Sequence, residues 1–380
     1  MNFSKLDAFM NGMPKRGYPG CELAVAKDGE VVYRTSVGFS NAAKTKPASK
    51  DDLYWIFSAT KVITCIAAMR LVEEGKIALD DPVSKYIPEY ATMTVKQEDG
   101  KVVPAKIPMT ILHLFTMTGG MTYERKSPSL VRAIMQNLNT LDTVRAMANE
   151  PLIFEPGTHY KYSLCHDVLA AVVEVVTGMR FSDYLDQLIF KPLGIKDMGF
   201  RPNDEQKARF CAMYKFQSGT VEATEIPCEN EYSLTPNYDS GGAGLFASVD
   251  EYIKIIAVIA NGGKTKDGYQ ILKPETIALM QKNHLCDDAR NDFVNGKLYG
   301  YGWGLCGRVH MDATVSLSRS PVGEFGWDGA ANAYVMVDAI NHIAIYFGTH
   351  IKNCGYGYRV IHPTLRDLVY EGLKEQKKMS

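Results

Sequence analysis

The fold of this chain is best read from the stretch Ser58-Ala59-Thr60-Lys61-Val62-Ile63-Thr64-Cys65-Ile66-Ala67-Ala68-Met69, which predicts a helix apolar on nearly every side. Residues three apart share a helical face, so the hydroxyl of Ser58 and the amine of Lys61 should lie within mutual reach. A helix without a polar face belongs in the middle of a molecule. We therefore expect residues 58–74 to form a buried central helix that ends at Gly75.

Ser58 and Lys61 are candidates for chemistry because of that burial. Desolvation favours a neutral lysine, and a neutral amine beside a serine hydroxyl is a general base beside a nucleophile. The start of a helix adds a backbone N–H and the positive end of the helix dipole, which suit a developing oxyanion. The same pair also fits an N-cap serine followed by a lysine that reaches the surface. An S-x-x-K pair alone leaves both interpretations open.

The two ends of the chain predict strands. Residues 21–26 and 30–37 are apolar runs joined by Lys27-Asp28-Gly29, a hairpin turn, and residues 333–337 and 343–347 form a similar pair. We expect terminal helices at residues 3–13 and 364–378. Helices in the middle are expected at residues 110–117, 130–148, 166–176, 181–189 and 250–259. This distribution predicts an α+β fold, with one antiparallel sheet from both chain ends and a helical insert.

Composition narrows the class of protein. Lys+Arg number 42 against Asp+Glu 43, which offers no electrostatic footprint for a nucleic acid or an anionic membrane. The first residues contain no apolar segment of a secretory signal, and no run of eighteen apolar residues exists. The eight cysteines never form C-x-x-C, so free thiols are favoured over disulfides. We expect a soluble, cytoplasmic protein without a nucleic-acid or membrane partner, of unknown oligomeric state.

Two further segments can join Ser58 and Lys61. Tyr162 lies between the turn at Pro156-Gly157 and a predicted helix, and a phenol near a lysine can relay a proton. The segment Trp327-Asp328-Gly329-Ala330 precedes a strand, where glycine lets the backbone approach a ligand closely. A packed tyrosine and a simple turn before a strand are the structural alternatives.

In this order, Ser58–Lys61, Tyr162-Ser163-Leu164 and Trp327-Asp328-Gly329 resemble the three motifs of the serine-active penicillin-recognising family, which includes β-lactamases, D-Ala-D-Ala peptidases and related esterases. Residues 17–20, 112–120, 192–198 and 241–248 also look like family segments, so the resemblance covers nearly the whole chain. It implies a β-lactamase/transpeptidase-like fold with a discontinuous α/β sandwich domain (residues 1–80 and 245–380) and a helical domain (residues 81–244). The active site would lie between them.

The resemblance also implies roles. Ser58 would be the acylated nucleophile, and Lys61 and Tyr162 would share the general base and acid roles. The backbone N–H groups of Ser58 and Ala330 would form the oxyanion hole. No metal and no cofactor are implied. The deacylating glutamate of class A β-lactamases has no counterpart here, so the layout is closer to class C.

Departures from the family pattern bear on the substrate. Leu164 stands where β-lactamases place an asparagine, and Trp327 stands where they place a lysine that meets the substrate carboxylate. Both departures resemble the family VIII carboxylesterases, and without those polar groups recognition of an anionic acyl-amide should be weak. Asp328 departs from both groups and puts a carboxylate near the site, which favours cationic substrates. We expect Leu164, Trp327, Asp328 and Gly329 to bind the substrate.

These observations predict a carboxylesterase that acts on small esters through an acyl-Ser58 intermediate. One alternative is a β-lactamase or a D-Ala-D-Ala or D-aminopeptidase-type hydrolase, with an amide substrate. A second alternative is a catalytically idle binding or regulatory module, against which the intact Ser58, Lys61 and Tyr162 set counts. No serine stands in G-x-S-x-G, and adjacent Cys165 and His166 should point apart on a helix, which favours core packing.

Overall fold

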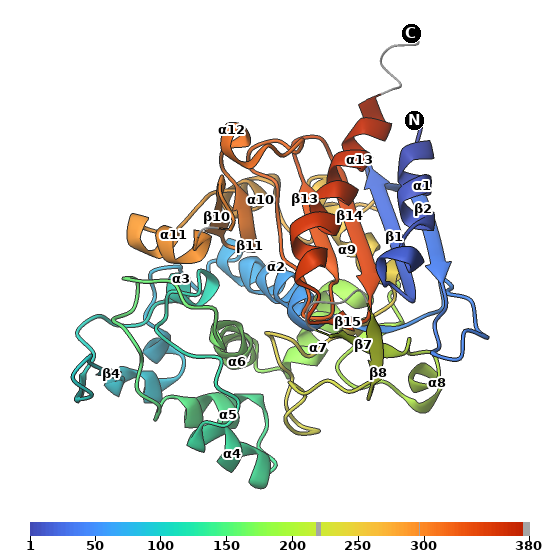
Figure 1. Ribbon diagram of the computed structural model, residues 1–380. Coiled ribbons are helices and arrows are strands. Elements are labelled where there is room, and N and C mark those ends of the chain that lie inside the picture. The colour runs from blue at the N-terminus through green and yellow to red at the C-terminus, as the bar shows by residue number, and fades with distance from the viewer. Residues whose placement is uncertain (218–221, 296, 375–380) are drawn as a thin grey trace.

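The computed structural model describes residues 1–217, 222–295 and 297–374 (Figure 1). Its main element is a seven-stranded antiparallel sheet with the order β10-β11-β12-β13-β14-β1-β2. The strands are β1 (Gly20–Lys27), β2 (Glu30–Gly38), β10 (Tyr301–Gly304), β11 (Gly307–His310), β12 (Phe325–Gly326), β13 (Tyr334–Asp338) and β14 (Ile343–Thr349). β1 pairs with β14, with Cys21 opposite Thr349, so the two chain ends meet in one sheet. The predicted α+β fold is confirmed.

Strands β1 and β14 are buried on both sides because helices cover both faces of this part of the sheet. Leu23 and Val25 of β1 pack in the core that includes α1 (Ser4–Asn11) and α13 (His362–Lys374). Ala24 and Ala26 point to the opposite face, as successive residues of a strand must, and share a core with α9 (Val249–Ala260). Figure 1 shows α1 and α13 side by side on the first face.

The Asp-Gly hairpin turn and the central helix both form as expected. Asp28 and Gly29 have φ angles of 53° and 79°, the pair of positive values that a tight two-residue hairpin turn needs. The central helix is α2 (Thr60–Glu73), whose residues from Thr60 to Met69 are all buried. Ser58 itself lies before α2, in the 3₁₀ turn η2 (Phe57–Ala59). The α-helix therefore begins at Thr60, two residues later than predicted.

The single helix predicted at residues 130–148 is wrong. Two helices stand there, α4 (Pro128–Met135) and α5 (Thr140–Met147). Asn137 adopts a left-handed φ of 51°, and the side chain of Asn139 accepts the N–H of Asp142 as an N-cap. Asparagine tolerates the left-handed region and caps helices well, so these two residues break an otherwise helical run.

Shorter elements complete the fold. The remaining α-helices are α3 (Ile111–Phe115), α6 (Cys165–Thr177), α7 (Phe181–Leu185), α8 (Asp204–Lys207), α10 (Pro274–Met280), α11 (Asp287–Val294) and α12 (Ala313–Ser316). Other short helices are η1 (Pro14–Arg16), η3 (Val83–Lys85), η4 (Pro88–Thr92), η5 (Asp186–Phe190) and η6 (Gly357–Ile361). Three small sheets pair β3 (Tyr54–Trp55), β9 (Phe246–Ala247) and β6 (Met198–Gly199), then β15 (Ile351–Lys352), β7 (Met213–Phe216) and β8 (Ala223–Ile226), and finally β4 (Thr94–Lys96) and β5 (Val102–Pro104).

The arrangement places α2 between the sheet and the helices of the chain's middle, where it contacts α6 (Figure 1). The strands of the large sheet all lie outside residues 81–244, and α3 to α7 lie inside that range. The domain boundaries at residues 80 and 244 stay a prediction. The last four residues of the terminal helix predicted at 364–378 lie outside the described residues. No helix in the described ranges has the length and apolar character that a membrane crossing needs.

Candidate active site

Ser58 lies directly before α2, in a turn with an unusual backbone. Its hydroxyl makes no capping hydrogen bond to η2 or to α2, whose N-cap is Ala59. This removes the interpretation of Ser58 as an N-cap. The preceding residue, Phe57, has a φ of 46°, which is rare for a bulky side chain. Such backbone strain persists only where the surroundings hold it in place, and it concentrates at functional sites.

Lys61 keeps its amine inside the protein. Lys61 is only 1% exposed, so its amine does not reach the surface. Its Nζ lies 3.4 Å from Ser58 Oγ and donates a hydrogen bond to the carbonyl oxygen of Gly242 at 2.6 Å. Burial lowers the pKa of the Lys61 amine to about 7, against the opposing effect of Asp167. A neutral amine is therefore present beside Ser58 near neutral pH.

Asp167 on α6 places a buried carboxyl group near Lys61. Its Oδ1 accepts hydrogen bonds from Tyr238 and Ser240, each at 2.7 Å, and its Oδ2 has no hydrogen-bond partner among the described residues. A Cβ on Gly242 would lie 2.5 Å from that Oδ2 and 3.4 Å from Lys61 Nζ. Only glycine fits at position 242, between the carboxylate and the amine. The sequence alone did not mark Asp167 as part of the site.

Two tyrosines flank the Lys61 amine. The rings of Tyr123 and Tyr162 stack with centroids 5.5 Å apart and planes 3° from parallel. Lys61 Nζ lies 3.4 Å from the hydroxyl oxygen of Tyr123 and 4.6 Å from the ring centroid of Tyr162. Burial raises the pKa of Tyr162, and hydrogen bonds with Ser58 and Trp327 lower it only in part. Both phenols therefore keep their protons at neutral pH, since burial also raises the pKa of Tyr123.

The segment from Trp327 to Ala330 closes the site on the side of the sheet. The indole N–H of Trp327 donates to the hydroxyl oxygen of Tyr162 at 2.9 Å. Gly329 approaches the turn of Ser58 closely, because a Cβ on Gly329 would lie 2.4 Å from the carbonyl oxygen of Ile56. Within the described residues, no protein acceptor takes the backbone N–H of Ser58 or of Ala330.

The carboxylate of Asp328 is matched within the protein. Its Oδ1 accepts a hydrogen bond from Arg308 Nη1 at 2.8 Å, and its Oδ2 lies 3.6 Å from His362 Nδ1. Although burial opposes ionisation, Arg308 and His362 hold the pKa of Asp328 below its usual value. This pairing removes the reason to expect cationic substrates.

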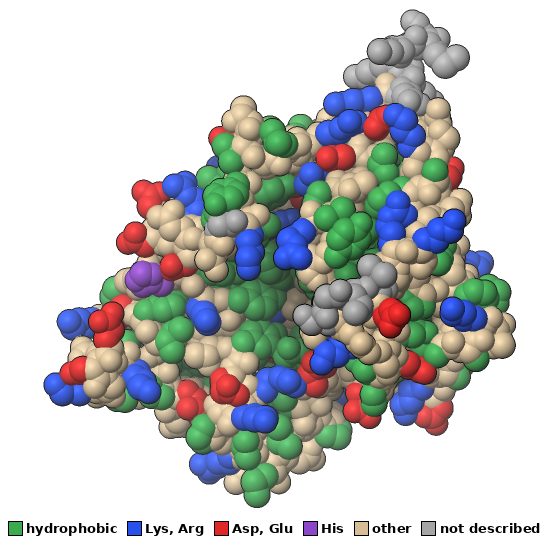
Figure 2. Space-filling model, in the orientation of Figure 1, with side chains coloured by type: hydrophobic (Ala, Val, Ile, Leu, Met, Phe, Trp, Pro, Cys, Tyr) green, Lys and Arg blue, Asp and Glu red, His purple; other side chains and the backbone are tan. Residues whose placement is uncertain are grey.

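An aromatic side chain packs beside Trp327, and an apolar cavity lies next to Leu164. Trp327 packs edge to face against Trp303 with ring centroids 4.5 Å apart. Leu164 is buried and lines a separate cavity of about 360 Å³, whose lining includes Glu124, Lys126 and Glu150 but none of the four residues Ser58, Lys61, Tyr162 and Trp327. The other apolar side chains around this cavity are Met93, Met121, Pro128, Leu130, Met147, Pro151 and Leu152. The space-filling view shows hydrophobic side chains gathered in a hollow near the middle of this face, with Lys and Arg side chains at its edge (Figure 2).

The structure thus brings Ser58 and Lys61, Tyr162 and Trp327 together from three distant parts of the chain. It adds Tyr123, for which the sequence carried no separate signal among 21 tyrosines. A family-like segment at residues 112–120 lies just before Tyr123 and is the one hint that was present. No cluster of three or more His, Cys, Asp or Glu side chains suited to a metal ion occurs within the described residues. Cys165 and His166 are both buried, as core packing requires.

Known proteins resemble this chain over most of its length. The profile of the Beta-lactamase family matches residues 5–353. Esterase EstB of Burkholderia gladioli is 29% identical over 97% of this chain and 95% of its own length. Lovastatin esterase of Penicillium rubens is 31% identical over 70% of this chain and 69% of its own. The structure of EstCE1, described as a hydrolase with promiscuous acyltransferase activity, covers 97% of this chain and 98% of its own with 25% identity and a TM-score of 0.81.

Lys61→Met should flatten the pH dependence of stability. The folded amine titrates with a pKa of about 7, against 10.5 for an ordinary lysine, so the unfolded chain binds more protons between these values. Wild-type stability should therefore rise with pH across this window relative to the variant, by up to about 1.4 kcal/mol per pH unit. Urea unfolding of both proteins at about pH 7 and about pH 9.5 measures the difference.

Lys254→Met is the matched control, because Lys254 lies on α9 with nearly half of its side chain exposed and pairs with Glu251. Its stability should run parallel to that of the wild type at every pH. Parallel curves for Lys61→Met as well would mean that the Lys61 amine remains charged in the folded protein.

Proposed function

The chain belongs to the beta-lactamase family, and from that membership we propose that it is a serine hydrolase, a carboxylesterase that forms an acyl-enzyme on Ser58. One observation carries this proposal: the Ser58 hydroxyl lies 3.4 Å from a buried amine whose pKa is about 7. A neutral amine at that distance can accept the serine proton as the oxygen attacks a carbonyl carbon.

The first half of the reaction transfers the acyl group. Ser58 Oγ attacks the ester carbonyl while its proton passes to Lys61 Nζ. The oxyanion receives hydrogen bonds from the backbone N–H groups of Ser58 and Ala330. As the tetrahedral intermediate collapses, the bond to the alcohol oxygen breaks, and that oxygen takes a proton from Lys61 through the Tyr162 hydroxyl. The products of this half are acyl-Ser58 and the free alcohol.

The second half returns the enzyme to its starting state. A water molecule attacks the acyl carbonyl and gives its proton to Lys61. Collapse of the second intermediate breaks the bond to Ser58 Oγ, which recovers the proton from Lys61 and releases the carboxylic acid. The Trp327 indole already donates to Tyr162, which leaves the Tyr162 O–H free to serve the leaving oxygen.

The walls of the site favour small, uncharged esters. Leu164 and Trp327 provide apolar contact but no carboxylate or amide partner for a β-lactam side chain. The names of the relatives, EstB and lovastatin esterase, agree with an ester substrate. A β-lactamase or D-Ala-D-Ala peptidase remains the second candidate, since those enzymes share the fold and the Ser58–Lys61 arrangement. An idle binding module is disfavoured, because it has no need of a buried neutral lysine beside a serine.

We also place the enzyme in the cytoplasm. All eight cysteines are free, which suits a reducing compartment. The near-zero formal charge of −1 argues against a nucleic-acid partner.

Ser58→Ala should abolish ester hydrolysis without unfolding the protein, because the hydroxyl caps no helix. The loss in kcat should reach several orders of magnitude. Steady-state hydrolysis of p-nitrophenyl butyrate measures it, and intact mass after treatment with a fluorophosphonate reports labelling of Ser58. Activity above about a tenth of wild type would remove Ser58 as nucleophile. An unlabelled wild type would favour the idle module.

The pH profile should follow the Lys61 amine. Only the neutral amine accepts a proton, so kcat/KM should fall about tenfold per pH unit below the pKa of about 7 and level off above it. Lys61→Arg should be inactive at every pH, because a guanidinium does not lose its proton in a protein. An arginine variant with most of the wild-type activity would assign the proton to Tyr162 instead.

Esters should be far better substrates than β-lactams. The wild-type kcat/KM for p-nitrophenyl butyrate should exceed that for nitrocefin, since Leu164 and Trp327 offer no polar partner. The double variant Leu164→Asn with Trp327→Lys should shift this ratio toward nitrocefin by roughly ten- to a hundredfold, the effect of one good charged contact. A wild-type kcat/KM for nitrocefin that equals the value for the ester would replace the esterase with the lactamase.

A further inference from the structure

Arg308 on β11 is a buried cation that connects two neighbouring strands. It is 6% exposed, its Nη1 donates to Asp328 at 2.8 Å and its Nη2 donates to the carbonyl oxygen of Val335 on β13 at 3.1 Å. Asp328 immediately follows Trp327, at the end of β12. The guanidinium therefore ties the active-site segment to the interior of the sheet.

The other oxygen of Asp328 faces the start of α13. Asp328 Oδ2 lies 3.6 Å from His362 Nδ1, and His362 Nε2 lies 3.2 Å from the carbonyl oxygen of Asn332. The hydroxyl of Tyr358 in η6 donates to the carbonyl oxygen of Gly329 at 2.8 Å. Contacts from two directions thus hold the turn that carries Gly329 and Ala330.

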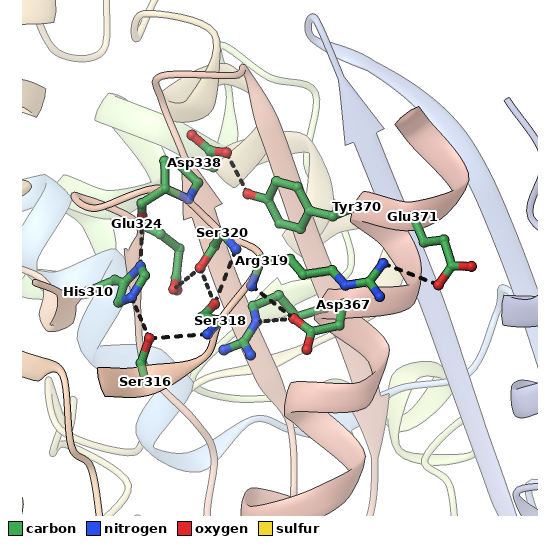
Figure 3. A network of polar contacts seen from close by, with 12 residues as sticks. His310, Ser316, Ser318, Arg319, Ser320, Glu324, Asp338, Asp367, Tyr370 and Glu371 are labelled. Carbon is green, nitrogen blue, oxygen red and sulfur yellow. Dashed lines mark hydrogen bonds and ion pairs between the residues drawn. The ribbon is translucent and has the colours of Figure 1, made fainter. Parts of the chain in front are cut away.

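Behind Arg308 stands a second buried carboxylate. Glu324 is fully buried, its Oε1 lies 4.0 Å from Arg308 Nη2, and its Oε2 accepts a hydrogen bond from Ser320 at 3.1 Å. Figure 3 shows Glu324 and Ser320 within a wider polar network that continues to Ser318 and His310. This network holds the Glu324 carboxylate 4.0 Å from the Arg308 guanidinium.

Stability alone does not account for such a pair. Burying two charges costs solvation, and apolar side chains of similar size often give an equally stable protein. A guanidinium and a carboxylate add a defined geometry, because their hydrogen bonds fix the orientation of the attached backbone. That geometry is useful here, since a displacement of about 1 Å in a reacting group costs roughly a hundredfold in rate.

We propose that Arg308 and Asp328 are positioning residues, whose buried pair holds the segment Trp327–Ala330 so that the Ala330 N–H faces the substrate oxygen and the Trp327 indole reaches Tyr162. Neither residue touches the substrate. The proposal rests on the esterase function proposed above, and it replaces the substrate-binding role expected for Asp328.

The sharpest test replaces the pair with apolar side chains. The double variant Arg308→Met with Asp328→Leu removes the hydrogen bonds that orient the segment and leaves the interior filled. Removing Arg308 also leaves the buried Glu324 without its neighbouring cation, so the melting temperature should fall. In the folded variant kcat for p-nitrophenyl butyrate should fall roughly ten- to a hundredfold. The inhibition constant of phenylboronic acid, which forms a tetrahedral adduct on serine, should rise by a similar factor. KM should change little.

Arg308→Lys and Asp328→Asn break the pair singly and provide a second measurement should the double variant not fold. They should lower kcat and weaken boronate binding together. The matched control is Arg34→Lys, which breaks another largely buried ion pair, Arg34 with Glu22, in the same sheet but away from the site. The control should lower the melting temperature and leave kcat and boronate inhibition within about twofold of wild type.

Three results would overturn the proposal. The first is a folded double variant that keeps wild-type kcat and boronate affinity. The second is a loss of kcat without weaker boronate binding, which would separate the pair from the oxyanion site. The third is a rise in KM alone, which would return Asp328 to substrate binding. A wild type that hydrolyses no ester would instead count against the esterase function, and the rate of fluorophosphonate labelling at Ser58 would then report positioning.

Discussion

The burial of the Lys61 amine is the constraint on which the rest of the structure depends. An ammonium at that position would lack water, and no carboxylate among the described residues lies within ion-pair distance of it, so the neutral amine is favoured. Burial on this scale requires α2 to be enclosed on all sides, by the sheet, by α6 and by the loop that carries Gly242. The central position of α2 and the chemistry of its first turn therefore have one physical cause.

The parts of the site that sequence could predict are local in the chain. Ser58 and Lys61 are three residues apart, and helix geometry alone brings them together. Tyr162 and Trp327 stand in recognisable motifs. Tyr123 and Asp167 could not be assigned, because their relation to Lys61 arises from the packing of α2 against a loop and against α6. Nothing in the local sequence around either residue separates it from the other tyrosines and aspartates of the chain.

The same distinction explains the fold. The long strands β1 and β14 were predictable from apolar runs, whereas β10 was not, because its sequence Tyr301-Gly302-Trp303-Gly304 is half glycine and glycine is depleted in strands. Packing decides there: a Cβ on Gly302 would lie 2.3 Å from Asn283 Oδ1. Similarly, the apolar pattern continues across the break between α4 and α5, so only the backbone preferences of Asn137 and Asn139 mark it.

The charge of the site changes between the reactive resting form and the transition state. In the reactive form of the site the Lys61 amine is neutral, a form that makes up about half of the molecules at about pH 7 because the pKa is about 7. Both tyrosines keep their protons, and Asp328 is matched by Arg308. Charge appears only as the reaction proceeds, when Lys61 gains a proton and the substrate oxygen becomes an oxyanion. An uncharged ester gains no electrostatic stabilisation on binding, and the new cation, the backbone N–H groups and the oxyanion interact mainly in the transition state. Interactions confined to the transition state lower the barrier, whereas a site charged at rest would strengthen binding of a charged substrate without raising kcat.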